Sequence, residues 1–186
     1  MDLLLGIFSA FGLSASAGLN AYIPLLVVAL LARFTHLIKL NPPWDTLANG
    51  WIIALLLLLS LIEFFADKIP AVNHVNDIIQ TFVRPCAGAI AFAASARAVS
   101  DVHPVLALAL GLLVAGGVHA AKSAVIRPAV TATTGGVANV PVSIAEDLIS
   151  TFVSILSALA PVLIAVLLLA VLVLILAYFS RRKNAV

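Results

Sequence analysis

Charged residues are scarce in this sequence, and their scarcity excludes more than any other feature. Only 10% of the 186 residues are Asp, Glu, Lys or Arg, against roughly 25% in ordinary soluble domains. Hydrophobic residues make up 63% of the chain, and its mean hydropathy is +1.21. This balance leaves no stretch from which a separate water-soluble domain could be built. We therefore expect an all-α chain that forms one integral membrane domain over residues 1–186.

Several motifs and residue types are missing as well. With a single cysteine, Cys86, an intramolecular disulfide is excluded. Apolar and polar residues do not alternate as they would along membrane-spanning β-strands. The sequence contains no HExxH metal-binding motif, no GxSxG nucleophile elbow and no cofactor motif, so we expect no cofactor. These absences make an enzyme the less favoured class of protein.

Long stretches without charge predict a polytopic helical bundle of about five spans. Residues 148–180, for example, exceed the roughly 20 residues that cross a bilayer as one helix. Ser143 and Glu146 match a capping box, which predicts a helix start at Ile144. Pro161 then interrupts the last stretch, because proline lacks a backbone donor. We expect spans over residues 3–32, 47–68, 77–96, 104–127 and 161–180, with a short entering helix over 144–158 before the last span.

The first uncharged stretch, residues 3–32, is too long for one upright span. As a single helix it would measure about 45 Å, against a hydrocarbon core of about 30 Å. Its centre contains Gly18, Asn20 and Pro24, which weaken a helix or are polar. Broken helices of this kind line substrate sites in transporters. The alternative is one tilted helix whose small residues pack against a neighbour. We expect a break near residues 17–20.

Five charged residues fall within 22 positions beside the uncharged stretches, and we expect them to be paired, solvated or functional. An ionisable group at membrane depth costs roughly 2.5–3.5 kcal/mol on insertion scales, so it is seldom kept without a use. Glu63 and Asp67 are four residues apart and share a helix face, which leaves Arg84 as their natural partner. The five residues are Glu63, Asp67, Lys68, Asp77 and Arg84.

Counting along the helices places three polar residues at one depth. Glu63 lies twelve residues beyond the expected interfacial tryptophan, or about 18 Å at ~1.5 Å per residue. Arg84 and Asn20 each lie thirteen residues from the next basic residue of a loop, about 20 Å in both cases. We therefore expect Glu63 and Arg84 to pair inside the bundle and to line a polar cavity beside the break.

A charged site at this depth has two interpretations. Carboxylates with a built-in arginine counter-ion are typical of proton- or cation-linked transport. Alternatively, a buried ion pair sets the register of the helices and moves nothing. The candidate substrate- or ion-binding residues are Asn20, Glu63, Asp67, Arg84, His119, Lys122 and Arg127.

The other polar residues also allow more than one role. His119 could relay protons or donate to a carbonyl of a neighbouring helix. Lys122 and Arg127, beside a Gly/Thr-rich segment, could bind an anionic solute or contact lipid phosphate. We expect Glu146 and Asp147 to be helix caps first and ion ligands second. A divalent ion could be gathered by Glu63, Asp67, His74 and Asp77, so the metal content stays open.

Two similar seven-residue segments suggest that the two halves of the chain arose by duplication and then diverged. Residues 77–83 read DIIQTFV and residues 147–153 read DLISTFV. Many transporter folds consist of two repeats, and the halves here would be residues 1–100 and 101–186. The alternative is a chance match in a chain that uses few residue types.

The distribution of basic residues predicts a cytoplasmic C-terminus, because cytoplasmic loops carry an excess of Lys and Arg. With five spans, six basic residues fall on the side of the C-terminus and three on the other side. The first group is Arg33, Lys39, Arg97, Arg181, Arg182 and Lys183, and the second is Lys68, Lys122 and Arg127.

Four motifs together resemble a known family. They are SASAGLNAYIPLL (14–26), EFFADKIPAVNHVND (63–77), RPCAGA (84–89) and HAAKSAVIRPAVTATTGGVANVPVSIAED (119–147). The sequence is similar to a bacterial integral-membrane family described only as domain of unknown function 4126, and the resemblance covers nearly the whole chain. It implies a small multispanning protein of the bacterial inner membrane and supplies no activity. Asn73 stands where the family usually has an acid.

Three classes of function remain after these observations. We favour a transporter or channel for a small solute or ion with a charged site inside the membrane. The alternatives are a structural or assembly subunit of a membrane complex and, less favoured, a lipid-acting intramembrane enzyme. The expected partners are the lipid bilayer and a small ion or anionic solute, with no nucleic acid. The sequence is also compatible with a homo-oligomer.

Overall fold

The computed structural model describes the backbone of residues 2–99 and 102–183 and most of their side chains. These residues are helical with no strand, which confirms the all-α class. The helices are α1 (Asp2–Leu19), α2 (Tyr22–Phe34), α3 (Gly50–Ala66), α4 (Pro70–Val99), α5 (Pro104–Ala121), α6 (Arg127–Thr134), α7 (Asn139–Leu159) and α8 (Pro161–Lys183), with a 3-10 turn at Trp44–Ala48 and a π-helical turn at Lys122–Ile126.

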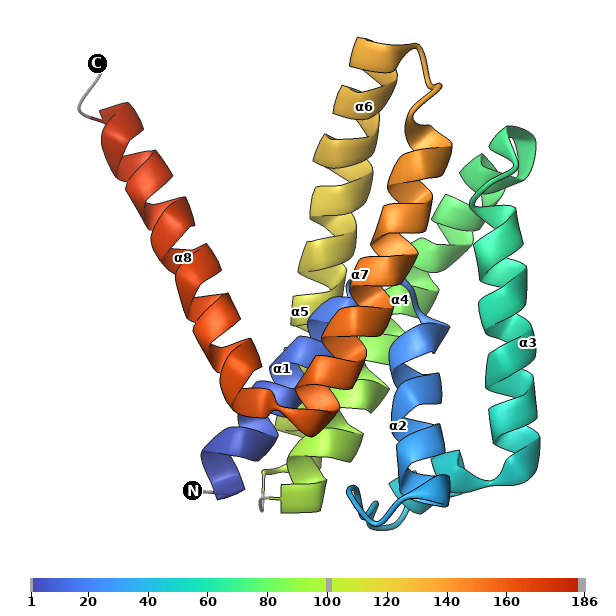
Figure 1. Ribbon diagram of the computed structural model, residues 1–186, viewed down its shortest axis with the longest axis vertical. Coiled ribbons are helices and arrows are strands. Elements are labelled where there is room, and N and C mark those ends of the chain that lie inside the picture. The colour runs from blue at the N-terminus through green and yellow to red at the C-terminus, as the bar shows by residue number, and fades with distance from the viewer. Residues whose placement is uncertain (1, 100–101, 184–186) are drawn as a thin grey trace.

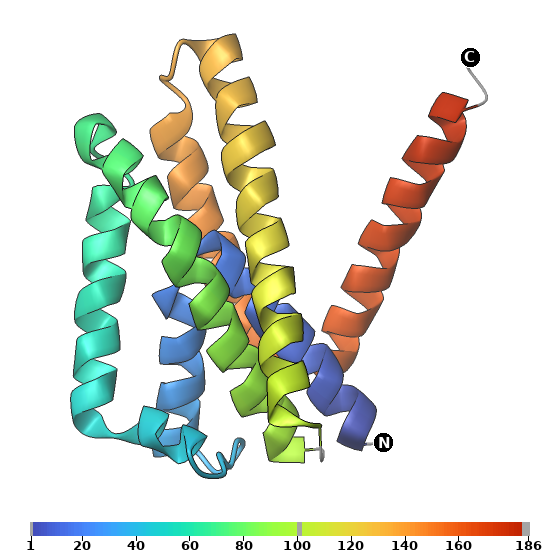
Figure 2. The ribbon, with the colours of Figure 1, turned by 180° about the vertical axis from the view of Figure 1, so that it is seen from behind.

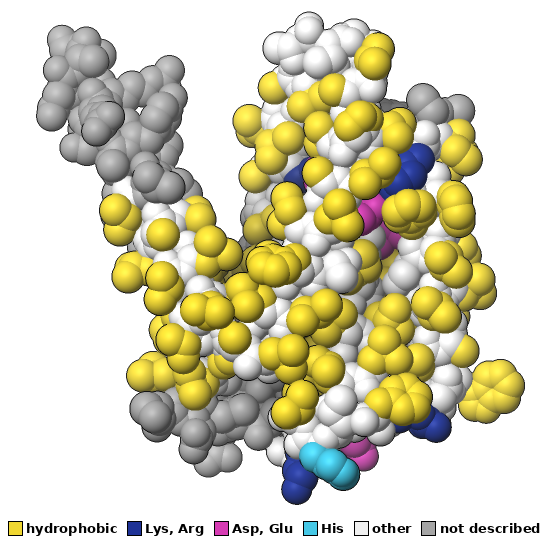
Figure 3. Space-filling view, viewed as in Figure 1, with side chains coloured by type: hydrophobic (Ala, Val, Ile, Leu, Met, Phe, Trp, Pro, Cys, Tyr) yellow, Lys and Arg dark blue, Asp and Glu magenta, His cyan; other side chains and the backbone are white. Residues whose placement is uncertain are grey.

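Three helical stretches are long and apolar enough to cross a membrane. They are Val75–Ala96 in α4, Pro104–Thr134 from α5 through α6, and Asn139–Leu159, which is α7. The shorter helices are also apolar, and hydrophobic side chains are spread over most of the described part of the face shown in Figure 3. The membrane class expected from composition therefore agrees with the fold.

The first uncharged stretch is broken, as the sequence predicted. α1 ends at Leu19 and α2 begins at Tyr22. The two halves do not continue in one direction, however. α1 enters from the end of the bundle that holds the N-terminus, and α2 returns to that same end (Figure 1). Together they form a helical hairpin with its tip at Asn20 and Ala21, and not the two successive halves of one span that we expected.

The last third of the chain differs from the expectation in a similar way. α7 begins at Asn139 and not at Ile144, and with 21 residues it is no short entering helix. The capping box fails because Ser143 lies inside the helix, with its hydroxyl unpartnered among the described residues. Gly135 and Gly136, at φ +62° and +89°, make the preceding turn and let the helix start earlier.

The course of α8 separates two groups of basic residues that the sequence placed together. α7 descends through the bundle and α8 rises again, so the last turn of α8 lies at the end opposite to the start of α1 and to the loop after α2 (Figure 1). Arg33 is at that loop, where it donates to the Ala48 carbonyl at 2.9 Å. The expected sharing of one membrane side by Arg33 and the C-terminal cations is therefore wrong.

Two other helices are longer than the sequence predicted. α4 starts at Pro70 and not at Asp77, because proline suits the first position of a helix, whose N–H has no intrahelical partner anyway. α5 continues through the π-helical turn and α6 to Thr134, seven residues past the expected end at Arg127. Pro128 is the second residue of α6, just after the π-helical turn. In the first turn of a helix the missing N–H of proline costs little, so Pro128 does not stop the chain of helices.

Small residues let the helices around α1 pack closely. α4 and α5 run side by side along α1 and lie in front of it in Figure 2. A Cβ atom added to Gly88 of α4 would lie 2.2 Å from the Cβ of Ala115 in α5. On the other flank of α1, the Ser16 hydroxyl contacts the hydroxyls of Ser150 and Ser154 in α7 at 2.8 and 2.7 Å. These contacts hold the hairpin between α4, α5 and α7.

Two glycine substitutions test this packing. Gly88→Ala should destabilise the protein by about 1–3 kcal/mol, because overpacking forces neighbouring backbones apart. Gly117→Ala is the matched control, since nothing lies within 4 Å of its added Cβ, and it should be neutral or stabilise the helix by up to about 1 kcal/mol. Unfolding in detergent measures both. Equal stabilities of the two variants would contradict the close α4–α5 contact.

Candidate functional site

The tip of the hairpin leaves backbone groups without helical partners, and a buried carboxylate satisfies one of them. The N–H of Ala21 donates to both carboxylate oxygens of Glu63, at 3.1 and 3.3 Å. The side-chain oxygen of Asn20 accepts from the N–H groups of Tyr22 and Ile23, at 3.2 and 3.1 Å. A negative charge at the start of α2 also faces the positive end of the helix dipole.

The opposite charge lies at the end of α1. Lys122 Nζ donates to the Leu19 carbonyl at 3.1 Å, so a cation meets the negative end of that helix. Lys122 is the first residue of the π-helical turn and is 1% exposed. Turns of this kind occur frequently at functional sites. At the break, the negative end of α1 therefore faces the cation of Lys122, and the positive end of α2 faces the carboxylate of Glu63.

The central ion pair of the site is the predicted one. Arg84 Nη2 and Nε lie 2.9 and 3.2 Å from Glu63 Oε1, and both side chains are fully buried. Arg84 Nη2 also reaches Asp67 Oδ2 at 3.4 Å. The expectation that Glu63 and Arg84 pair inside the bundle is confirmed.

His119 extends this pair with a defined tautomer. Arg84 Nη1 lies 3.1 Å from His119 Nδ1, and because a guanidinium only donates, Nδ1 accepts and the ring is neutral. The proton is then on Nε2, which donates to the hydroxyl of Thr81 at 3.2 Å. The hydroxyl of Thr81 in turn donates a hydrogen bond to the backbone carbonyl of Asp77 at 2.8 Å. A direct bond from the ring to a helix carbonyl, the simpler expectation, is not observed.

A second half of the network lies around Arg127. Its guanidinium contacts Glu146, Asp67 and Asp77 at 3.2, 3.3 and 3.4 Å. Lys122 approaches the same Glu146 carboxylate at 2.7 Å. We call the whole set of charged side chains the ion network. Its members are Glu63, Asp67, Lys68, Asp77, Arg84, Lys122, Arg127, Glu146 and Asp147.

All seven residues selected from the sequence lie in or beside the ion network. Asn20 is included because its amide donates to Asp147 Oδ1 at 3.0 Å, and Lys68 binds the other oxygen of Asp147 at 2.9 Å. Their role in binding a substrate or ion stays a prediction. Asn76 was missed, and it donates to Asp67 Oδ1 at 2.7 Å.

Glu146 and Asp147 were expected to act mainly as helix caps, and the structure gives them a larger role in charge pairing. Both are buried and charge-paired inside the network. The similarity of the two seven-residue segments could have identified one of them, because Asp147 occupies in the second segment the position of Asp77 in the first, and both aspartates are network members. The described residues contain no group of three or more His, Cys, Asp or Glu arranged for a metal ion, and the side chain of His74 lies outside the description.

The network approaches the molecular surface on one side. In the upper part of the face in Figure 3, a few charged side chains are visible between apolar ones. A cavity of about 460 Å³ between α4, α6 and α7 is lined by Asp77, Ser123, Arg127 and Asn139. Asp77 Oδ1 is buried there and has no hydrogen-bond partner among the described residues. Asp77 and Arg127 are therefore the network members that a solute in this cavity would contact.

The surroundings of the helix break differ from the polar cavity that we predicted there. Glu63 and Arg84 are fully buried and do not line the cavity described above. The backbone groups at the break are satisfied by the side chains of Glu63, Lys122 and Asn20. The backbone freed by the break is therefore solvated by protein charges, which meets the same physical requirement.

These features describe an all-helical protein, with three helical stretches long and apolar enough to cross a membrane, whose α1–α2 hairpin ends on a buried ion network. Residues 7–182 match the model of the family described as "Domain of unknown function (DUF4126)", and the chain belongs to this family. No curated protein and no solved structure matches the chain.

Pairing of Glu63 with Arg84 can be tested by comparing single and double substitutions. Arg84→Ala leaves the Glu63 carboxylate buried without its main partner, which should cost about 3–5 kcal/mol. The double variant Glu63→Gln, Arg84→Gln removes both charges and should lose clearly less. Denaturant or thermal unfolding in detergent gives the values. Losses of equal size would show that the two side chains do not act as a pair.

Proposed function

We propose that the protein is a small transporter or channel that moves an ion across the membrane by way of the ion network. One observation carries this proposal. The tip of the α1–α2 hairpin lies inside the bundle, where its backbone groups bind the buried charged side chains of Glu63 and Lys122. Irregular backbone at membrane depth is tolerated only where protein or water satisfies it, and in transporters such breaks form the binding site.

The sharing of partners within the network supports movement of charge. Asp67 lies within 4 Å of three cations, namely Arg84, Lys122 and Arg127. Arg127 in turn contacts three carboxylates. A side chain with several partners can release one of them without leaving a lone buried charge, which would be costly. An ion could therefore enter the network by small rearrangements.

The balance of charges favours a cation over an anionic solute. The described network contains five carboxylates and four cationic side chains, and His119 is neutral. No surplus of positive charge is left to attract an anion. The unpartnered oxygen of Asp77 beside the cavity is also an acceptor for a proton or a small cation. We therefore choose a proton or alkali cation as the transported species.

One observation favours a second candidate, the structural or assembly subunit. Every carboxylate of the network lies within 4 Å of at least one cation, and such buried pairs can serve only to fix the register of helices. No observation favours a lipid-acting enzyme. Measuring ion flux separates the two remaining classes.

For the membrane topology, we propose five spans, formed by α3, α4, α5 with α6, α7 and α8, with the hairpin entering from one side. The resemblance to bacterial membrane proteins supports a place in the inner membrane. The basic residues after α8 support a cytoplasmic C-terminus. The hairpin would then open toward the outside. These basic residues are Arg181, Arg182 and Lys183.

Flux in proteoliposomes tests the proposal. The purified protein should carry protons or an alkali cation down a gradient faster than protein-free vesicles. Asp77→Asn should lower that flux by about tenfold or more, because it removes the charge that faces the cavity. Asp45→Asn is the matched control, since Asp45 lies in the 3-10 turn away from the network. Flux no greater than in empty vesicles would favour the structural subunit instead.

A further inference from the structure

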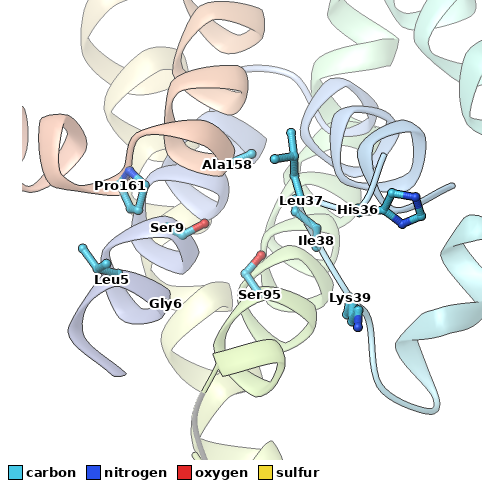
Figure 4. Close-up of a pocket in the computed structure, with 10 residues that line it drawn as sticks. All are labelled: Leu5, Gly6, Ser9, His36, Leu37, Ile38, Lys39, Ser95, Ala158 and Pro161. Carbon is cyan, nitrogen blue, oxygen red and sulfur yellow. The ribbon is translucent and has the colours of Figure 1, made fainter. Parts of the chain in front are cut away.

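A second cavity lies at the open end of the hairpin, away from the ion network. It has a volume of about 320 Å³ and is enclosed by the start of α1, residues 36–39, α4 and the turn between α7 and α8 (Figure 4). None of the network residues lines it. The cavity is therefore a separate feature, and its role does not depend on transport.

Two serines from neighbouring helices line this cavity. Ser9 belongs to α1 and Ser95 to α4, and Figure 4 shows both side chains at the cavity. Serines within helices commonly donate to the carbonyl four residues earlier, as Ser60 and Ser157 do here. Ser9 and Ser95 make no such bond in the described part of the chain, although Ser95 is only 7% exposed. They are free to bind a ligand.

The residues that line this cavity include a cationic side chain and no carboxylate. Lys39 and His36 line it, whereas no Asp or Glu does. Lys39 has no ion-pair partner among the described residues, so its positive charge is not neutralised by the protein. The remaining wall is largely apolar, with Leu5, Leu37 and Pro161 among its residues. An anionic group with an apolar extension complements such a site.

The position of the cavity matches the headgroup layer of a bilayer. It lies at the end of the bundle where the loop after α2 and the start of α3 are found (Figure 1). Trp51 at the start of α3 is 86% exposed, and tryptophan is enriched at membrane interfaces. Beyond the cavity, α8 presents exposed apolar side chains such as Val162 and Leu163, against which acyl chains can pack.

We propose that this cavity binds the headgroup of an anionic phospholipid. The phosphate accepts hydrogen bonds from Ser9 and Ser95 and faces the ammonium of Lys39. Inorganic phosphate would leave the apolar wall without a partner. A zwitterionic lipid would bring its own cation next to the ammonium of Lys39, which repels it.

Lipid binding to the purified full-length protein in a neutral detergent tests this proposal. Native mass spectrometry should retain one phosphatidylglycerol in preference to phosphatidylcholine. Lys39→Gln should weaken that binding roughly fivefold, as expected for the loss of one basic residue near an anionic headgroup. Ser95→Leu should abolish it by filling the cavity. Lys183→Gln removes a charge at the opposite end of the bundle and is the matched control.

The outcomes decide between the sources of the phosphate. Equal retention of phosphatidylcholine, or an unchanged affinity in Lys39→Gln, would overturn the proposal. If inorganic phosphate competes with the lipid at equal concentration, the site is an anion site and not a lipid site. Thermal unfolding of each variant, compared with the wild type, shows that the fold is kept. Loss of ion flux alone would bear on the network and not on this cavity.

Discussion

The hydrogen bonds from the Ala21 N–H to Glu63 are the interaction on which the rest of the structure depends. They let a helix end inside an apolar bundle, where an unpaired backbone donor would cost several kcal/mol. The carboxylate that accepts them needs a counter-ion, which Arg84 provides at 2.9 Å. Arg84 and its neighbours then require further acceptors of their own. The ion network follows from one broken helix by successive neutralisation of buried groups.

The network also explains why helices from the whole chain meet at one place. The end of α3 contributes Asp67, the π-helical turn contributes Lys122, and α7 contributes Glu146, which Lys122 contacts at 2.7 Å. A buried charge cannot be left without its partner, so each of these elements is fixed relative to the hairpin tip. The same contacts can support ion movement, because several side chains already have a second partner within reach.

The sequence allowed the break and the central pair to be predicted, because both follow from quantities that can be counted. Excess length and polar residues indicated the break at Asn20, and equal distances along two helices indicated the pair of Glu63 with Arg84. The direction of α2 could not be predicted, since residue counts give lengths and not reversals. The start of α7 was missed because the turn at Gly135 was not considered as the start signal.

Labelling of cysteines at the two ends of the hairpin tests the central claim most directly. Leu4 and Phe34 are 58% and 73% exposed, and each can be replaced by cysteine in a Cys86→Ala background. A membrane-impermeant thiol reagent should label both positions from the same side of sealed, oriented vesicles. Labelling from opposite sides would show that α1 and α2 cross the membrane as one span, and would contradict the re-entrant hairpin on which the ion network is built.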